Sequence, residues 1–237
     1  MPEKDKNPQE GPDIRSNLIK VNMGGDTMFV DPDQYKPQIE HQKKLKRLHR
    51  KPKNPKPGEW VSKDYSKHKV ADYKPFNFVD GEGVRCSLYV SGCLFDCPGC
   101  YNLAAQNFNY GFPYTQELED RIINDLSQSY VQGLTLLGGE PFLNTDVCLR
   151  IINRIRKEFG HKKDIWSWSG YTWDELQKET PDKKEMLSKI DILVDGRFMN
   201  DLKDLTLQFR GSSNQRIIDV PKSMKAGKVV IWDKLQR

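Results

Sequence analysis

The stretch Ser91-Gly-Cys-Leu-Phe-Asp-Cys-Pro-Gly-Cys-Tyr101 holds three of the five cysteines of this 237-residue chain. The spacing Cys93-x3-Cys97-x2-Cys100 places three thiolates on one short loop. Cysteine thiolates are the ligands of iron–sulfur clusters, and three of them leave one iron of a four-iron cube free to bind another molecule. The loop therefore predicts a 4Fe-4S site with one open position, and the elements on either side of it indicate the fold.

Structural zinc and a disulfide framework are the alternative uses of these cysteines. Zinc ribbons supply two closely spaced pairs of ligands, and the nearest further candidates, Cys86, Cys148, His68 and His161, form no second pair. Disulfide frameworks are typical of secreted chains with an even number of cysteines, whereas this chain has five and begins with a charged segment without an apolar run. We therefore expect reduced thiols and a cytoplasmic protein without a membrane partner.

Charge divides the chain into two parts. Residues 1–75 carry 17 Lys and Arg against 11 Asp and Glu, a balance of +6. Subtraction from the totals of 38 and 33 leaves 21 and 22, a balance of −1, for residues 76–237. The basic excess of the chain therefore lies in its N-terminal third.

The N-terminal residues 1–57 contain few large apolar residues and no sustained hydrophobic period, which predicts a largely disordered basic extension with a basic helix at 35–51. Eight Lys or Arg and no acid lie between Lys43 and Lys56. Such a run can bind nucleic acid, but without interleaved aromatic residues it is more often a solvated tail, so nucleic acid is not an expected partner. Proline and glycine at 52–58 mark a boundary, and we expect one folded domain at 58–237.

Alternating strands and helices are predicted after this boundary. Apolar patterns indicate strands at 85–90, 133–137, 163–168 and 190–194, and helices at 115–129, 145–159 and 172–188. Cys86 falls in the first strand and Cys148 on the apolar side of the second helix, so both are expected to be core thiols. This order implies an α/β fold with a parallel sheet, and about 160 folded residues suffice for a partial (βα) barrel only.

Four motifs follow four of these strands. They are the cysteine loop, Gly138-Gly139-Glu140-Pro141, Ser169-Gly-Tyr171 and Asp195-Gly-Arg197. Sites in parallel α/β folds gather at the carboxyl ends of the strands, so we expect the four motifs to meet at one rim of the sheet.

Six blocks in colinear order, from about Trp60 to Pro221, carry a resemblance to a known family. The blocks are Asp80-Gly-Glu-Gly-Val-Arg85, Leu88-Tyr-Val-Ser-Gly-Cys93, Cys97-Pro-Gly-Cys-Tyr-Asn102, Trp166-Ser-Trp-Ser-Gly-Tyr171, Leu193-Val-Asp-Gly-Arg-Phe198 and Arg210-Gly-Ser-Ser-Asn-Gln215. Together they resemble the radical S-adenosylmethionine enzymes, and among these the activating proteins of the anaerobic ribonucleoside-triphosphate reductase.

The resemblance implies a partial barrel of the radical S-adenosylmethionine type and two cofactors, a 4Fe-4S cluster and S-adenosylmethionine. It implies reductive cleavage of S-adenosylmethionine to a 5′-deoxyadenosyl radical, which takes hydrogen from a glycine of the reductase and leaves a glycyl radical. The implied partners are the reductase, as protein substrate, and flavodoxin or a similar low-potential electron donor. Such an oxidoreductase needs no histidine or aspartate base, because the step is hydrogen-atom transfer.

Site residues follow from the same resemblance. Cys93, Cys97 and Cys100 are the expected cluster ligands and catalytic residues. The other expected contacts are with S-adenosylmethionine. Its methionine end should meet Gly138, Gly139 and Glu140, and its adenine should lie along Gly99, Cys100 and Tyr101. Ser167 or Ser169 should bind its carboxylate or ribose, and Asp195 a cation or the cofactor. Relatives often carry an aromatic residue directly before the last cysteine, where this chain has Gly99. This difference affects only the expected contact with the adenine.

A protein substrate also needs a docking surface, which we expect on the polar glycine-bearing loops 80–85 and 210–216. Two other functions remain open on the residues alone. A radical S-adenosylmethionine enzyme acting on a small molecule would cleave the cofactor productively without a protein partner. A zinc-stabilised module with a basic nucleic-acid-binding arm would contain zinc and bind DNA in a salt-sensitive manner.

Overall fold

The computed structural model describes residues 19–23, 26–30 and 51–234. The chain forms two compact units, Met1–His49 and Arg50–Arg237. In the first unit, β1 (Ile19–Met23) and β2 (Asp26–Val30) pair as antiparallel strands. The basic helix predicted at 35–51 lies, except for its last residue, outside the described residues.

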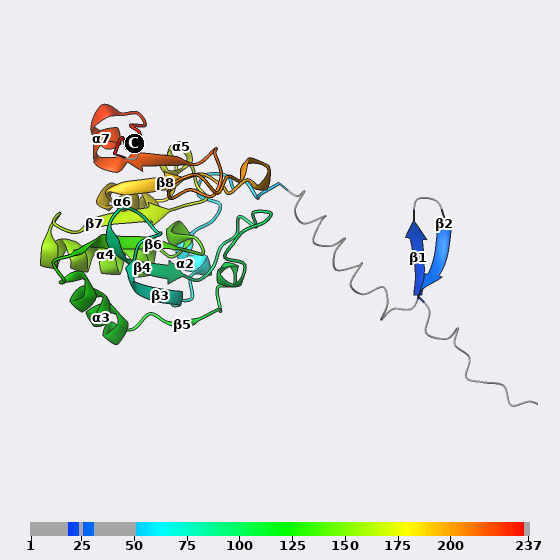
Figure 1. Cartoon of the computed structure of the whole chain (residues 1–237), viewed down its shortest axis with the longest axis horizontal. Coiled ribbons are helices and arrows are strands. Elements are labelled where there is room, and N and C mark those ends of the chain that lie inside the picture. The colour runs from blue at the N-terminus through cyan, green and yellow to red at the C-terminus, as the bar shows by residue number, and fades with distance from the viewer. Residues whose placement is uncertain (1–18, 24–25, 31–50, 235–237) are drawn as a thin grey trace, which may run out of the picture. The chain divides into compact units, whose positions relative to one another are not determined.

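The second unit is built on a seven-stranded sheet of mixed direction, with the order β5-β3-β4-β6-β7-β8-β9 (Figure 1). The central strands β4, β6, β7 and β8 are parallel, which confirms the predicted α/β sheet at its centre. The outer pairings β3–β4, β3–β5 and β8–β9 are antiparallel, and the sequence did not indicate them. The barrel type stays a prediction. The strands are β3 (Lys69–Asn77), β4 (Val84–Val90), β5 (Phe112–Pro113), β6 (Val131–Gly138), β7 (Asp164–Trp168), β8 (Ile192–Asp195) and β9 (Arg216–Asp219).

Helices follow the central strands, as the alternating pattern predicted. Thr115 accepts a hydrogen bond from the Leu118 amide and so caps α3, which confirms the predicted start of that helix. The longer helices are α3 (Gln116–Leu126), α4 (Thr145–Phe159), α6 (Pro181–Lys189) and α7 (Val220–Ala226), and the short ones are α2 (Ser62–Tyr65), α5 (Trp173–Leu176), η2 (Ala104–Gln106), η3 (Pro141–Leu143) and η4 (Asn200–Leu202). None of the helices in the described ranges is long and apolar enough to cross a membrane.

The prediction of a single helix at 172–188 is wrong. The structure has α5 and α6 in its place, because Pro181 interrupts the segment. Proline lacks an amide donor and disfavours helical backbone in the preceding residue, and Thr180 is accordingly extended with φ −60° and ψ 155°. Pro181 is therefore the first residue of α6.

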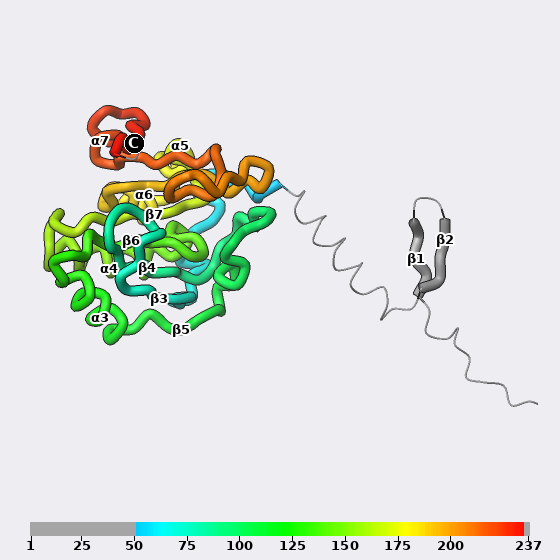
Figure 2. The backbone as a smooth tube through the Cα atoms, in the orientation of Figure 1, coloured from blue at the N-terminus to red at the C-terminus, as the bar shows by residue number. Residues whose placement is uncertain are grey.

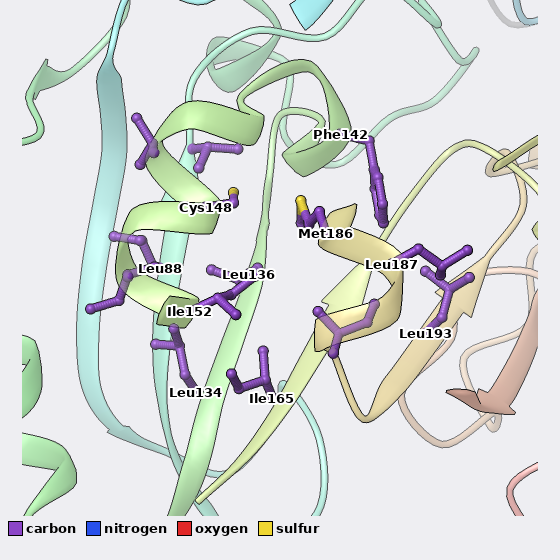
Figure 3. Close-up of a cluster of buried hydrophobic side chains, with 14 of the residues drawn as sticks. Leu88, Leu134, Leu136, Phe142, Cys148, Ile152, Ile165, Met186, Leu187 and Leu193 are labelled. Atoms are coloured by element: carbon purple, nitrogen blue, oxygen red, sulfur yellow. The ribbon is translucent and has the colours of Figure 1, made fainter. Parts of the chain in front are cut away.

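The main core lies between the sheet and the helices. In Figure 3, Cys148 and Ile152 of α4 lie over strand side chains that include Leu88 and Leu136, and these residues share one buried cluster. Cys86 and Cys148 are both fully buried, which confirms them as core thiols. A smaller cluster is formed by strand residues Trp166, Ile192, Val194 and Ile217, with Trp168, Phe209 and Trp232 packed against it.

Candidate functional site

A pocket opens where the central parallel strands end. The cysteine loop after β4, the Gly138-Gly139-Glu140 turn after β6, Trp168-Ser-Gly170 after β7 and Gly196 after β8 all line it. The predicted meeting of the four motifs at one rim is therefore found in the structure. Cys93, Cys97 and Cys100 are all on the wall of this pocket.

Backbone contacts fix the base of the cysteine loop. The Gly92 amide donates to the Ala105 carbonyl at 2.7 Å, and the Cys93 amide donates to the Gln106 carbonyl at 3.1 Å. Gly92 has a φ of +104°, and a Cβ there would lie 2.0 Å from the Phe108 ring. Only glycine tolerates both this backbone conformation and such a close approach to the Phe108 ring, so Gly92 fixes the path of the chain from β4 into the cysteine loop.

The glycine turn after β6 is held directly against the cysteine loop. The Gly139 amide donates to the Val90 carbonyl and the Glu140 amide donates to the Gly92 carbonyl, each at 2.8 Å. A Cβ on Gly139 would lie 2.4 Å from the same Gly92 oxygen. From the other side, the Asn102 side-chain amide donates to the Gly138 carbonyl at 3.3 Å. The turn and the loop therefore form one hydrogen-bonded layer.

Glu140 is buried under this layer with 1% of its surface exposed. Its carboxylate accepts hydrogen bonds from the Ser169 hydroxyl and the Gly170 amide at 2.8 Å and from the Phe142 amide at 3.1 Å. Burial raises the pKa of Glu140 to about 7 despite these three donors. Glu140 thus ties the ends of β6 and β7 together behind the pocket.

Two thiols of the loop, those of Cys93 and Cys97, have raised pKa values. Burial raises the pKa of Cys93 well above its ordinary value, and the Glu140 charge raises it further. Burial, followed by the charge of Cys100, raises the pKa of Cys97 to about 11. The thiolates are thus close enough to oppose one another's ionisation, and bound cations would reverse this effect.

In the described part of the chain, no three His, Cys, Asp or Glu side chains are grouped to hold a single metal ion. An iron–sulfur cluster instead distributes its thiolate ligands over several irons. Three cysteines lining one pocket fit such a group.

The comparisons with known proteins concern the same part of the chain. The sequence model of a family described as a 4Fe-4S single cluster domain matches residues 79–218. The anaerobic ribonucleoside-triphosphate reductase-activating protein of Escherichia coli K12 is 46% identical over 147 residues, which cover 60% of this chain and 93% of that protein. The chain belongs to the family of anaerobic ribonucleoside-triphosphate reductase-activating proteins.

Two further relatives carry the same name. The activating protein of Haemophilus influenzae is 44% identical over 149 residues, 61% of this chain and 94% of that protein. The activating protein of bacteriophage T4 is 37% identical over 145 residues, 60% of this chain and 88% of that protein. The family resemblance stated from the sequence motifs is therefore confirmed.

For this member of the activating-protein family, the pocket contains five of the nine residues expected to contact a cofactor, namely Cys100, Gly138, Gly139, Glu140 and Ser169.

The other four, Gly99, Tyr101, Ser167 and Asp195, are not among its lining residues. Tyr101 is 98% exposed. Ser167 is buried in β7, and its hydroxyl lies 3.4 Å from the Trp168 carbonyl. A Cβ on Gly99 would lie 2.6 Å from the Asn200 side-chain oxygen.

Asp195 is paired within the fold. Its carboxylate accepts from the Arg216 guanidinium at 3.0 and 2.5 Å and from the Trp173 amide at 2.7 Å. Arg216 is thereby partly withdrawn from the docking surface expected at 210–216. In the other expected docking loop, the Arg85 side chain is fully buried and forms an ion pair with Asp164 at 2.6 Å.

Several pocket residues had no predicted role. Asn102, Trp168, Phe198 and Gln215 line the pocket and lie within the quoted sequence blocks. Their membership in those blocks was the available signal, but their residue types indicate no specific chemistry. Only the strand-end geometry shows that they share a wall with the cysteines.

Proposed function

We propose that this chain activates an anaerobic ribonucleoside-triphosphate reductase in the cytoplasm, as an oxidoreductase of the radical S-adenosylmethionine type. Cys93, Cys97 and Cys100 would hold a 4Fe-4S cluster, which would supply the electron for cleavage of S-adenosylmethionine to methionine and a 5′-deoxyadenosyl radical. This radical would take hydrogen from a glycine of the reductase and leave a glycyl radical. Flavodoxin or a similar low-potential protein is the proposed electron donor. The function carried by the names of the relatives supports the choice of partner.

One observation carries the proposal: three cysteines of a single loop line the same pocket as the Gly138-Gly139-Glu140 turn. Cys93, Cys97 and Cys100 would hold three irons, which leaves the fourth free for the amino and carboxylate groups of S-adenosylmethionine. The two glycines let the backbone approach the methionine end without side-chain obstruction.

Glu140 has a limited capacity for a further contact. A carboxylate offers about four acceptor positions, and the Ser169, Gly170 and Phe142 donors use three of them. We therefore assign Glu140 to orienting the β7 end, with one remaining position available to an ammonium group. Ser169 acts through Glu140 in the same way.

Apolar side chains form part of the pocket wall. Phe95, Leu137, Trp168 and Phe198 line it beside the cysteines. Excluding water protects a reactive radical from side reactions, so this wall suits the proposed chemistry.

The test is anaerobic. The chain is purified without oxygen, iron and sulfide are counted, and S-adenosylmethionine is added after reduction, with and without the reductase. We expect about four irons per chain, formation of methionine and 5′-deoxyadenosine, and a glycyl radical signal on the reductase by electron paramagnetic resonance.

The other functions predict different results. Iron and productive cleavage without a radical on the reductase would indicate an enzyme acting on a small molecule. Zinc without any cleavage would overturn the proposal.

A further inference from the structure

The segment Lys53–Trp60 lies against the cysteine loop although it precedes residues 79–218, which match the family. The Lys53 amide donates to the Phe95 carbonyl at 2.8 Å, and the Lys53 carbonyl accepts from the Arg197 Nε at 3.0 Å. In Figure 2 the cyan start of the second unit accordingly runs beside the orange loop after β8. Phe95 lies midway between Cys93 and Cys97, so this contact reaches the centre of the cysteine loop.

Trp60 fixes the side chain of the same residue. Its ring, 6% exposed, meets the Phe95 ring edge to face at 5.1 Å between centroids and the Tyr171 ring at 6.4 Å. Phe95 and Tyr171 are themselves 4.9 Å apart, so the three rings form a closed cluster. Edge-to-face pairs add stabilisation beyond the burial of their area. The segment thus holds Phe95 by both its carbonyl and its ring.

A buried ion pair anchors the end of the segment. The Lys183 ammonium is fully buried and donates to the Trp60 carbonyl at 2.6 Å, the Tyr171 hydroxyl at 2.9 Å and Glu179 at 3.0 Å. These acceptors use all three of its donors. Glu179 also accepts from the Gly58 amide at 3.3 Å. The segment is therefore tied to the domain at Gly58 and Trp60 as well as at Lys53.

We propose that residues 53–60 form a strap that positions the cysteine loop, with Trp60 as the positioning residue. Because Phe95 separates Cys93 from Cys97, holding Phe95 limits how far these two cysteines can move relative to each other. The inference rests on the proposed function only in taking the group bound by the three cysteines to be an iron–sulfur cluster.

The test uses the full-length iron-free chain, kept reduced, and measures the alkylation rate of each cysteine with iodoacetamide by mass spectrometry. Cys86 and Cys148 are fully buried in the core and report global unfolding, whereas Cys93, Cys97 and Cys100 report opening of the loop. In Trp60→Ala we expect the alkylation rates of the loop cysteines to rise about tenfold more than those of the two core cysteines, which share a cluster with Trp60 and report the global loss of stability.

A second variant loosens the strap without removing a core side chain. Pro55 is half-buried and Pro57 is exposed, so replacing both with glycine leaves the core intact. Added backbone freedom should raise the loop alkylation rates about two- to fivefold. Trp60→Phe keeps an aromatic ring against Phe95 and should restore rates close to those of the original chain.

Trp232→Ala is the control for loss of a tryptophan away from the loop, because Trp232 is partly buried against the smaller cluster. It should leave the loop rates unchanged. In the iron-loaded chain, the strap variants should release iron to bathophenanthroline disulfonate faster than this control does.

The proposal is overturned if the loop rates stay unchanged in both strap variants, or if all five cysteines react faster to the same extent. Since alkylation requires neither S-adenosylmethionine nor the reductase, this result is independent of whether activation of the reductase is observed.

Discussion

At the scale of single residues, Glu140 gives the pocket a titratable group near neutral pH. Burial raises its pKa from 4.5 to about 7. As pH rises, the Glu140 carboxyl of the iron-free chain loses its proton at lower pH in the unfolded state than in the folded state. The free energy of unfolding should therefore fall between pH 4.5 and pH 7. The contribution of Glu140 protonation to the free energy of unfolding amounts to about 3 kcal/mol, is fully present below pH 4.5 and is lost above pH 7.

Denaturant unfolding at pH 5 and pH 8 checks this prediction. Glu140→Gln should lose this component of the pH dependence, whereas Glu158→Gln on the exposed side of α4 should keep it. An equal pH dependence in the original chain and in Glu140→Gln would show that Glu140 titrates normally.

Gly139 tests how tightly the glycine turn fits the cysteine loop. A methyl group there would lie 2.4 Å from the Gly92 carbonyl and 2.8 Å from the Ala105 carbonyl, both backbone atoms that accept hydrogen bonds in the loop. Gly139→Ala should cost about 1–3 kcal/mol of unfolding free energy and lower the iron content. Gly227→Ala is the control: its φ of +65° also strains an alanine, but the new methyl group meets nothing within 4 Å and lies outside the pocket lining, so this variant should keep its iron. Full iron loading of Gly139→Ala would contradict the close fit.

Asp195 shows what the sequence alone leaves undetermined at this scale. Its place after a parallel strand indicates a site residue, as for Gly138 and Gly139. Its partner Arg216, however, lies in β9, which pairs antiparallel with β8 in the register Asp195↔Arg216. That pairing depends on the return path of the chain, which no local pattern encodes.

At the scale of elements, the buried central strands were predictable because they are continuous apolar runs between turns. Three strands at the sides of the sheet, β3, β5 and β9, were not. β3 carries Pro75 and alternates irregularly, and proline argues against a strand assignment. β5 has only two residues, and β9 has two apolar residues between two charged ones, whereas β8 of the same length is apolar at three of its four positions.

The Arg85–Asp164 pair connects β4 with β7 across β6. Arg85 also donates to the Thr135 hydroxyl at 2.8 Å and the Leu134 carbonyl at 2.9 Å, and its side chain is fully buried. Arg85→Ala should lower the free energy of unfolding by about 3–5 kcal/mol, because it opens a cavity and leaves the carboxylate without its cation. Chemical denaturation of the iron-free chain measures this loss.

The pair between the exposed Arg121 and the half-buried Asp125 is the control for this ion pair. Arg121→Ala removes a partner that is 62% exposed and should change the stability by no more than about 0.5 kcal/mol. A double-mutant cycle with Asp164→Asn should show coupling of about 1–3 kcal/mol between Arg85 and Asp164. Additive losses would mean that the pair does not stabilise the sheet as a unit.

At the scale of the whole molecule, the site lies at one end of the sheet and the core lies beneath it. The main cluster runs from Trp60 through α4 to Val220, and its buried members from the cysteine loop are Phe95 and Cys97. Some small metal-binding domains unfold without metal because their core is insufficient. Here the core is built from residues of the sheet and helices, so the fold should not depend on iron.

We therefore expect the iron-free chain to keep its far-ultraviolet circular dichroism and a cooperative unfolding transition. Hydrogen exchange should stay slow in β6 and α4, whose amides lie in and over the core, and should accelerate on iron removal at residues 92–106, where the loop loses its bound group. The loaded chain, kept anaerobic, is the reference. Loss of protection in β6 on iron removal would instead show that the bound cluster holds the fold together and that the pocket is a structural centre of this unit.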